Sequence, residues 1–402
     1  MLLSLTTGPV AAAFYLVAPA LAVLLAAWFF VRKPILKALL IIPAAGYGLW
    51  QVANLVDDLG GYRARRHYAQ VQKALRRPAE WDRITQLSGE QAIIAASLTA
   101  EGLADYAARF PASRQESRQL TENLLLVLTG PGHCPFENVF DTTAWATREH
   151  NLYLSHLNVV LGCYARLGTA SPTAQPRLRY QQLHDQLTRY LIRRLSAALG
   201  HNAPSYGDNG GMLWVADNAV TLHSIYLHNT ATPPRAATLL SEEWVRHLLR
   251  TATHPSGLPL SELCDQVEPR GCANAWMAKY VRTYAPAYSR QLWEQHKQTM
   301  KRNFGMAAGF REYLPQSTLQ PDYDSGPIVF GLGAAATGLA LCGARYQGDY
   351  YTYYQILNAV QLTEAALRCL SLLAPGDEWA QAADSWLAQA IQFNAAAHLT
   401  TD

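Results

Sequence analysis

Two long apolar runs open the chain. Residues 8–30 carry no charged side chain, Arg32-Lys33-Pro34 interrupts the pattern, and residues 39–56 are again uncharged. A helix that crosses a bilayer needs about 20 such residues, so the first run predicts a membrane anchor. The second run, residues 35–56, carries Lys37 near its start and is a weaker candidate. Because no basic segment precedes the first run and no small-residue cleavage site follows it, we expect a retained anchor rather than a removed signal peptide.

From residue 65 onward the pattern changes to helical periodicity. Leu183, Leu187, Leu191 and Leu195 recur every four residues, which places them on one face of a helix. Strand-like alternation is almost absent. The same reasoning predicts twelve helices, at residues 65–78, 90–110, 115–129, 143–168, 176–199, 211–229, 236–252, 272–284, 287–303, 326–346, 349–371 and 376–396.

The connections between these helices alternate in character. Long polar loops rich in Gly and Pro cover residues 130–142, 200–210, 253–271 and 304–325, and each precedes a helix rich in Ala, Gly and aromatic residues. Repeated helix pairs indicate a stacked or closed helical array. We therefore predict an all-α fold, an (α/α)6 barrel (toroid) at residues 61–402 behind a membrane anchor at residues 1–60. An open solenoid is the alternative.

Composition narrows the classes of function. Half of the residues are hydrophobic, 16% are charged and the net charge is +3, without a basic stripe interleaved with aromatic residues, which argues against nucleic acid as a partner. None of the six cysteines forms a C-x-x-C pair, so we expect no zinc site. Cys264 and Cys272 could form a disulfide or remain free thiols. Phosphate-binding loops and nucleophile elbows are missing from the sequence, which disfavours hydride and phosphoryl transfer.

The richest candidate chemistry lies in the segment from Tyr206 to Asn218. Asp208 and Asp217 stand nine residues apart, with Trp214 between them, and the second lies among apolar residues where an unpaired carboxylate is costly to bury. Such a pair could act as acid and base, with Tyr206 and Trp214 as cavity walls. Alternatively, Asp208 is a turn residue and Asp217 is held by a neighbouring Arg.

A second group of candidates is Glu149, Tyr153 and His156. Their spacing of four and seven residues places them on one helical face. A buried carboxylate beside His156 would set the tautomer and basicity of its ring. The alternative is a histidine that belongs to a buried polar network.

Three further residues complete the candidate list. Asp324 precedes a helix rich in Ala and Gly, where it could line the pocket or simply cap the helix. Glu262 could reach the cavity, although loop acids are usually solvated. Trp276 could form a cavity wall, since aromatic faces stabilise developing cations, or it could pack in the core.

Several of these segments resemble the linalool dehydratase/isomerase family. The matching positions are Glu149, Tyr153, His156, Leu157 and Asn158 in a pattern E-x-x-x-Y-x-x-H-L-N, then Arg179, Tyr180, His184, Leu187, Thr188 and Arg189 in R-Y-x-x-x-H-x-x-L-T-R, and Asp322, Asp324 and Gly326 in D-x-D-x-G. The resemblance covers roughly residues 85–370 and is distant. It implies an (α/α)6 barrel that removes water from a small isoprenoid alcohol, or rearranges it, without a metal or organic cofactor.

The departures from this family matter as much as the matches. His156 carries over as an active-site residue, but the family's two active-site cysteines fall in the segment that here holds Asp208 and Asp217. No cysteine lies between Cys163 and Cys264, and the family's early Asp and Tyr site residues have no clear match. Carboxylates would have to replace the thiols. The anchor also differs from the family's secreted enzyme and would suit a lipophilic substrate taken from the bilayer.

These observations together predict a membrane-anchored lyase or isomerase that acts on an apolar, isoprenoid-type alcohol. Asp217 and His156 would be its acid/base pair, helped by Asp208 and Asp324, with no cofactor. The expected partners are the substrate, the bilayer of a bacterial-type inner membrane and, as an open alternative, a second copy of the chain. The charge distribution favours a cytoplasmic large domain and the family a periplasmic one. The rival functions are a glycan-active enzyme on the same barrel and a non-catalytic helical scaffold.

Overall fold

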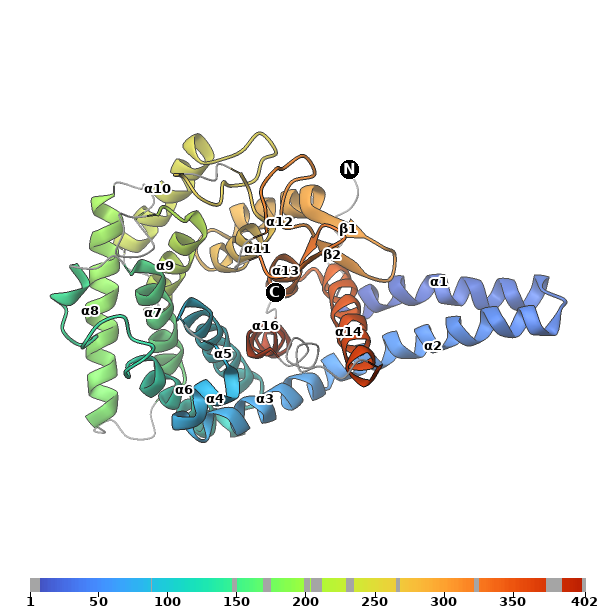
Figure 1. Ribbon diagram of the computed structural model, residues 1–402, viewed down its shortest axis with the longest axis horizontal. Helices are drawn as coiled ribbons and strands as arrows, with labels where there is room; N and C mark the ends of the chain where they lie inside the picture. The colour runs from blue at the N-terminus through green and yellow to red at the C-terminus, as the bar shows by residue number, and fades with distance from the viewer. Residues whose placement is uncertain are drawn as a thin grey trace.

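The structure is a computed structural model, and it describes residues 8–87, 89–146, 150–168, 175–198, 203, 212–228, 235–264, 268–321, 325–373 and 385–399. It is mostly helical with few strands, as the sequence pattern predicts, and two helices at the N-terminus are long and apolar enough to cross a membrane. Figure 1 shows these two helices, α1 (Pro9–Phe30) and α2 (Pro34–Leu59), as a hairpin that projects from the remaining helices.

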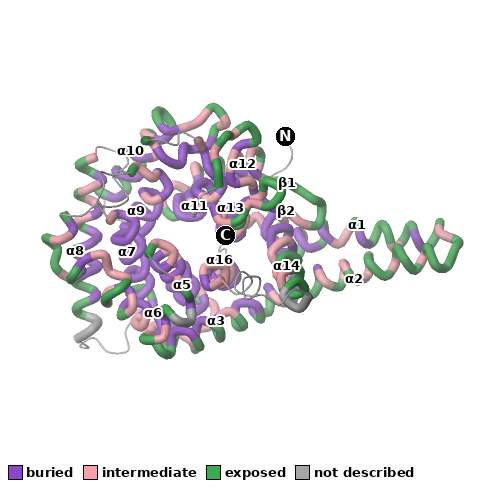
Figure 2. Tube along the Cα trace, viewed as in Figure 1, coloured by how far each residue is buried: buried purple, intermediate pink, exposed green. Residues whose placement is uncertain are grey.

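In the described part of the chain, a set of central helices holds most of the buried side chains, and a set of outer helices covers them (Figure 2). The central helices are α5 (Gly89–Arg109), α7 (Asn151–Arg166), α9 (Val215–His228), α11 (Gly271–Tyr280), α13 (Ala334–Tyr346) and α16 (Trp386–Ala397). The outer helices are α3 (Tyr62–Leu75), α6 (Arg114–Leu128), α8 (Gln175–Ala197), α10 (Arg235–Thr251), α12 (Pro286–Met300) and α14 (Tyr350–Leu373).

Short elements connect these helices. The helical turns are η1 (Pro78–Glu80), α4 (Trp81–Thr85), η2 (Pro111–Ser113), η3 (Ala144–Ala146) and η4 (Val281–Thr283). The strands are β1 (Lys301–Asn303), β2 (Ala308–Phe310), β3 (Ile328–Val329) and β4 (Leu332–Gly333). β1 pairs with β2 and β3 with β4, both antiparallel, and Arg302 lies opposite Gly309 in the first pair.

The central helices pack against one another in chain order. α5 packs against α7, α7 against α9, α9 against α11, α11 against α13 and α13 against α16, and α16 packs back against α5. The outer helices lie on them: α6 on α5 and α7, α8 on α7 and α9, α10 on α9, α12 on α11, α14 on α13, and α3 on α16 and α5. Each central helix therefore has protein on several sides.

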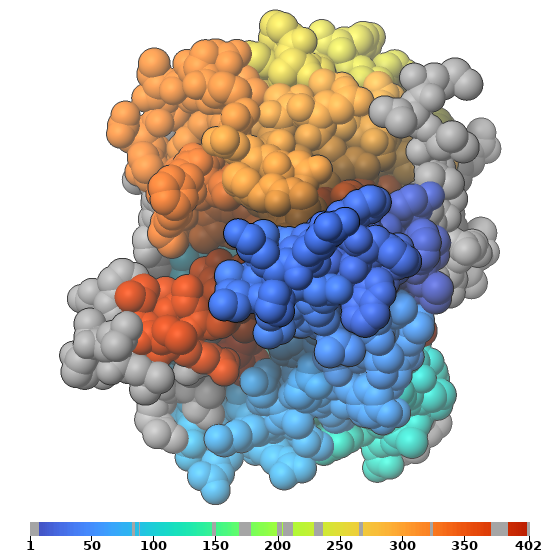
Figure 3. All heavy atoms as spheres, turned by 90° about the vertical axis from the view of Figure 1, so that its right-hand side faces the viewer, coloured from blue at the N-terminus to red at the C-terminus, as the bar shows by residue number. Residues whose placement is uncertain are grey.

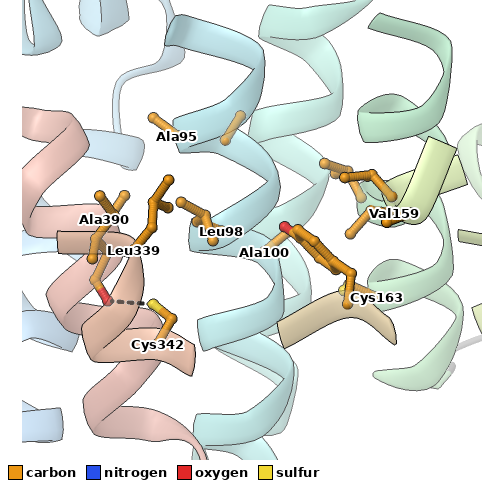
Figure 4. Packing of buried hydrophobic residues seen from close by; sticks show 14 of the residues in the cluster. Ala95, Leu98, Ala100, Val159, Cys163, Leu339, Cys342 and Ala390 are labelled. Carbon is orange, nitrogen blue, oxygen red and sulfur yellow. Dashed lines mark hydrogen bonds between the residues drawn. The ribbon is translucent and has the colours of Figure 1, made fainter. Parts of the chain in front are cut away.

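Small residues allow the central helices to approach closely. On α5, Ala95, Leu98 and Ala100 lie between α7 and the pair α13 and α16, and Cys342 of α13 donates a hydrogen bond to the Ile391 carbonyl at 3.4 Å (Figure 4). At Gly102 an added Cβ would lie 2.7 Å from the Phe393 ring of α16. In contrast, the outer helices are amphipathic, as the Leu repeat of α8 predicts, because only one face of each is covered.

Buried polar contacts attach the hairpin to the rest of the chain. Asp58, at the C-terminal end of α2, accepts hydrogen bonds from Arg345 of α13 at 2.8 Å and from Tyr354 of α14 at 3.1 Å. All three side chains are buried. Gln51 and Asn54 of α2 donate to Asn358 of α14 at 3.1 and 3.2 Å. Beyond these contacts the hairpin exposes its apolar side chains, including Phe30, Ile35, Ile42 and Leu49.

Several predicted helices begin or end elsewhere in the structure, among them those predicted at 211–229 and 376–396, whose helical residues in the described part of the chain begin at Val215 and Trp386. The helix predicted at 143–168 begins only at Asn151, after η3, and the helix predicted at 287–303 ends at Met300, where β1 begins. The start of the helix predicted at 326–346 is the β3–β4 hairpin. Its turn places Phe330 and Gly331 at φ values of +53° and +76°, outside the helical region. The helical periodicity of the sequence did not predict this turn.

Candidate functional site

His156 lies fully buried on α7, among the central helices. Its Nδ1 is 2.6 Å from the Ser97 hydroxyl of α5, and that hydroxyl donates its proton to the Ile94 carbonyl at 3.0 Å. A hydroxyl has one proton, so with that proton on the Ile94 carbonyl Ser97 accepts from Nδ1–H and the lone pair of His156 is on Nε2; we assign this tautomer to the ring. Nε2 is buried and has no hydrogen-bond partner among the residues that the structure describes.

Burial also keeps this ring uncharged. It lowers the pKa of His156 from 6.5 to about 3; the charge of Glu101 opposes this shift, and Lys279 and His223 add to it. Trp276 of α11 meets the imidazole edge-on, with ring centroids 5.4 Å apart, and its Nε1 is likewise buried without a partner. The site therefore presents a neutral base beside an aromatic wall.

A cluster of buried charges lies next to this pair. Glu101 of α5 forms an ion pair with Lys279 of α11 and accepts a hydrogen bond from His223 Nε2 of α9 at 3.0 Å. Tyr280 of α11 donates to the same carboxylate at 3.4 Å, and the other nitrogen of His223 is 2.7 Å from the Thr283 hydroxyl. All of these except Thr283 are buried. One carboxylate thus joins three central helices.

The charge of Glu101 is fixed by its neighbours. Burial alone would raise the pKa of Glu101, but Lys279 and His223 outweigh burial and lower it from 4.5 to about 2. Burial and Glu101 raise the pKa of Tyr280 well above its usual value. Glu101 is therefore an anion and Tyr280 a neutral phenol near pH 7, so Glu101 holds no proton to donate.

The polar face of α5 that carries Ser97 and Glu101 continues for one more helical turn, to Asp105. Ser97, Glu101 and Asp105 follow at intervals of four residues and so share a helical face. Asp105 is 2.7 Å from His398 Nδ1 and 3.3 Å from Arg166, and these two partners lower the pKa of Asp105 although burial opposes them. Successive polar layers therefore follow α5, beginning with the uncharged Ser97–His156 pair.

Asp217, the expected partner of His156, lies on the first turn of α9 and is half-buried. Its carbonyl oxygen accepts from Thr221, whose hydroxyl is 2.7 Å from Ser155 of α7. The two predicted residues therefore stand on neighbouring helices. They share no hydrogen bond, since Nδ1 of His156 binds Ser97 and Nε2 has no partner.

The predicted cavity walls lie in different surroundings. Trp214 and Glu262 face each other in an antiparallel bridge, and the buried Glu262 carboxylate accepts from the Cys264 amide at 3.0 Å. Tyr153 donates to the Leu128 carbonyl of α6 at 2.7 Å, so it faces α6 whereas His156 faces α5 and α11. Of the predicted lining residues, Trp276 contacts His156.

Four predicted residues, Glu149, Tyr206, Asp208 and Asp324, lie outside the described residues. All six cysteines are free thiols, so Cys264 and Cys272 are not joined, and Cys272 donates to Glu312 at 2.8 Å. Within the described ranges, no group of three or more His, Cys, Asp or Glu side chains is arranged to hold a metal ion.

From the sequence, Glu101, His223 and Lys279 were not identified as site residues, although their positions indicated burial. Glu101, His223 and Lys279 each stand alone within an apolar helical segment, as in Ala100-Glu101-Gly102. The cost of burying an unpaired charge, applied above to Asp217, applies equally to these positions. What the sequence does not contain is their pairing, because Glu101 lies more than a hundred residues from both of its partners.

In comparison with known proteins, no family model and no curated protein matches this chain.

Proposed function

We propose that the chain is a membrane-anchored lyase or isomerase that acts by acid–base chemistry on an apolar, isoprenoid-type alcohol. The central and outer helices would form an (α/α)6 toroid. Its support is the packing of α16 back against α5, which joins the last central helix to the first, with one outer helix for each central one. A solenoid would leave its first and last helices apart.

The observation that carries the proposal is the unpartnered Nε2 of His156. A neutral imidazole with a free lone pair can accept a proton from a substrate carbon, and its burial excludes competing water. In a dehydration the C–O bond breaks, the hydroxyl leaves as water with a proton from an acid, and His156 removes a C–H proton as the double bond forms. Asp217, on the neighbouring helix, is the proposed acid, and it would regain its proton from His156.

The surroundings of His156 favour an apolar substrate with cationic character in the transition state. Trp276 provides an aromatic face beside the base, and such faces stabilise cations. Glu101 remains ionised about one helical turn from Ser97, and its charge favours positive charge at His156, although its ion-pair partner Lys279 opposes this effect. A developing carbocation is stabilised by both features.

The glycan-active alternative fits the described residues less well. A glycosidase needs a carboxylic acid that is protonated near neutral pH, with a raised pKa, facing a second carboxylate. The most buried carboxylate at the site, Glu101, has a pKa lowered to about 2 and is committed to Lys279 and His223. This argument favours the apolar alcohol over a sugar.

We also propose that α1 and α2 cross the bilayer of a bacterial-type inner membrane. Both are long and apolar enough, and the tip between them carries Arg32, Lys33 and Lys37. Two crossings place this tip opposite the large domain. The domain side carries more basic residues near the membrane, which favours a cytoplasmic domain under the positive-inside rule.

The test is an assay of detergent-purified full-length protein with a panel of short isoprenoid alcohols, followed by gas chromatography. The parent should form a diene or a rearranged alcohol, and the Asp217→Asn/His156→Ala variant should not. His296→Phe is the matched control, because His296 is equally buried but lies on α12. Equal product from all three proteins would refute the roles of Asp217 and His156. No turnover by the parent would favour a glycan substrate or a scaffold.

A further inference from the structure

The turn between β1 and β2 lies near the point where the α1–α2 hairpin would enter the bilayer. We propose that the turn between β1 and β2, together with one side chain of α14, inserts into the boundary between lipid headgroups and acyl chains. We call Phe304, Met306 and Leu362 the turn patch. The inference rests on the proposed crossing of the bilayer by α1 and α2.

The turn patch is apolar and unusually exposed. Phe304, Met306 and Leu362 are 55%, 48% and 49% exposed. Exposed large apolar side chains that cluster at a turn are typical of a contact surface rather than of a solvated loop. Figure 3 shows the segment around residue 300 in orange and α14 in red on the same face of the molecule as the blue hairpin.

A single side chain connects the patch to the hairpin. The Asn358 amide of α14 donates to the Met306 carbonyl at 2.7 Å, and its oxygen accepts from Gln51 at 3.1 Å and from Asn54 at 3.2 Å. Gln355, one turn earlier on α14, donates to Asn303 at 3.0 Å and also to the Gly305 carbonyl. The turn is therefore held against α14, two hydrogen bonds away from α2.

The contacts with α2 indicate where the turn patch lies relative to the proposed membrane–water interface. On α2, Leu49 is 72% exposed and apolar, whereas Gln51 is buried in the polar contacts with α14. Trp50 lies between them and donates to Gln361 at 3.0 Å. A tryptophan at the change from apolar to polar residues is typical of the membrane–water interface. Two hydrogen bonds through Asn358 join Met306 to Gln51, so the interface that α2 predicts passes close to the patch.

The charge next to the patch fits an anionic lipid surface. Arg302 is exposed, and its guanidinium lies 5.9 Å from the centroid of the Phe304 ring. A basic side chain near the surface of an anionic membrane is attracted to it. Lys301 is held by Thr352 and Gln355 at 2.9 and 2.8 Å. Arg302 is thus the cation that we expect to meet lipid headgroups.

The test places an environment-sensitive fluorescent amino acid at one position at a time in the full chain. The positions are Met306 in the patch, Leu40 in the hairpin and Leu249 on α10, at the end of the domain away from the hairpin (Figure 1). The protein is reconstituted in phosphatidylcholine vesicles, with and without phosphatidylglycerol, and the vesicles contain brominated lipids as quenchers. Leu249 is the matched control because it is 51% exposed.

We expect quenching at 40 and at 306 but not at 249, and stronger quenching at 306 with the anionic lipid. Quenching at 40 with none at 306 would overturn the docking of the turn patch and leave the anchor intact. Loss of quenching at both positions would overturn the anchor and the docking together, whereas the acid–base proposal is judged separately by the product assay.

Discussion

At the scale of single residues, the chain buries several histidines in uncharged form. Burial lowers the pKa of His156, His184 and His296 to about 3, the second with help from His228. Between pH 6.5 and 3 the unfolded chain binds protons at these positions and the folded chain does not. Stability therefore falls as the pH falls, by about 1.4 kcal/mol per pH unit for each such histidine.

His296 allows this effect to be measured away from the proposed site. Both of its ring nitrogens lack a hydrogen-bond partner, and the ring stacks on Phe310 with centroids 4.8 Å apart. We predict that His296→Phe reduces the loss of stability between pH 6.5 and pH 5 by about 2 kcal/mol. Chemical denaturation of the detergent-solubilised protein at both pH values measures it. Unchanged acid sensitivity in the variant would show that His296 does not titrate as its burial implies.

At the scale of elements, the buried Glu101 carboxylate joins three central helices, and removing one of its partners should lower the stability of the fold. Glu101 of α5 meets Lys279 of α11 and His223 of α9. We predict that Lys279→Met destabilises the fold by about 3–5 kcal/mol, since it leaves Glu101 charged and buried. Adding Glu101→Gln should recover most of this loss, because Gln still accepts from His223.

Thermal unfolding of the two single variants and the double variant forms a cycle that isolates this coupling. The prediction requires the double variant to be more stable than Lys279→Met alone. If the losses simply add, the ion pair does not join the helices as its geometry implies.

Contact between the first and last central helices rests on close packing at Gly102. A Cβ there would lie 2.7 Å from the Phe393 ring. We predict that Gly102→Ala costs about 1–3 kcal/mol, despite the higher helix propensity of Ala. Combining it with Phe393→Leu, which makes room for the new methyl group, should cost less than the sum of the two single changes. A stabilised Gly102→Ala variant would mean that α5 and α16 are further apart.

The sequence predicted the helices well and the site only in part. Periodic apolar spacing places α8 or α10 within a few residues, because packing of one face determines that spacing. It wrongly extended helices over residues 301–303 and 328–333, which form short strands beside turns that contain glycine. His156 was found from its spacing to Tyr153, yet the two residues face different helices. Lys279 and Glu101 were missed because only the tertiary fold brings them together.

At the scale of the whole molecule, the two proposed crossings of the bilayer would place the hairpin tip and the large domain on opposite sides. We predict that Lys33→Cys, at the tip, reacts with a membrane-impermeant maleimide from the side opposite to Cys264 and Cys369. Both native cysteines are exposed on the domain and serve as internal controls. The measurement uses sealed membrane vesicles of one orientation, labelled from outside before and after permeabilisation. Reaction of all three thiols from one side would contradict a double crossing.

The central claim is that His156 offers a neutral, unpartnered Nε2 to an apolar substrate. The most direct measurement is the nitrogen NMR spectrum of histidine-labelled full-length protein in bilayers, with the His156 signals assigned by their loss in His156→Gln. Our account predicts the Nδ1–H tautomer from pH 8 down to about pH 5, since burial lowers the pKa to about 3, and a shift of the Nε2 signal when an isoprenoid alcohol is added. Protonation of His156 near pH 6.5, or an Nε2–H tautomer that no alcohol perturbs, would contradict it.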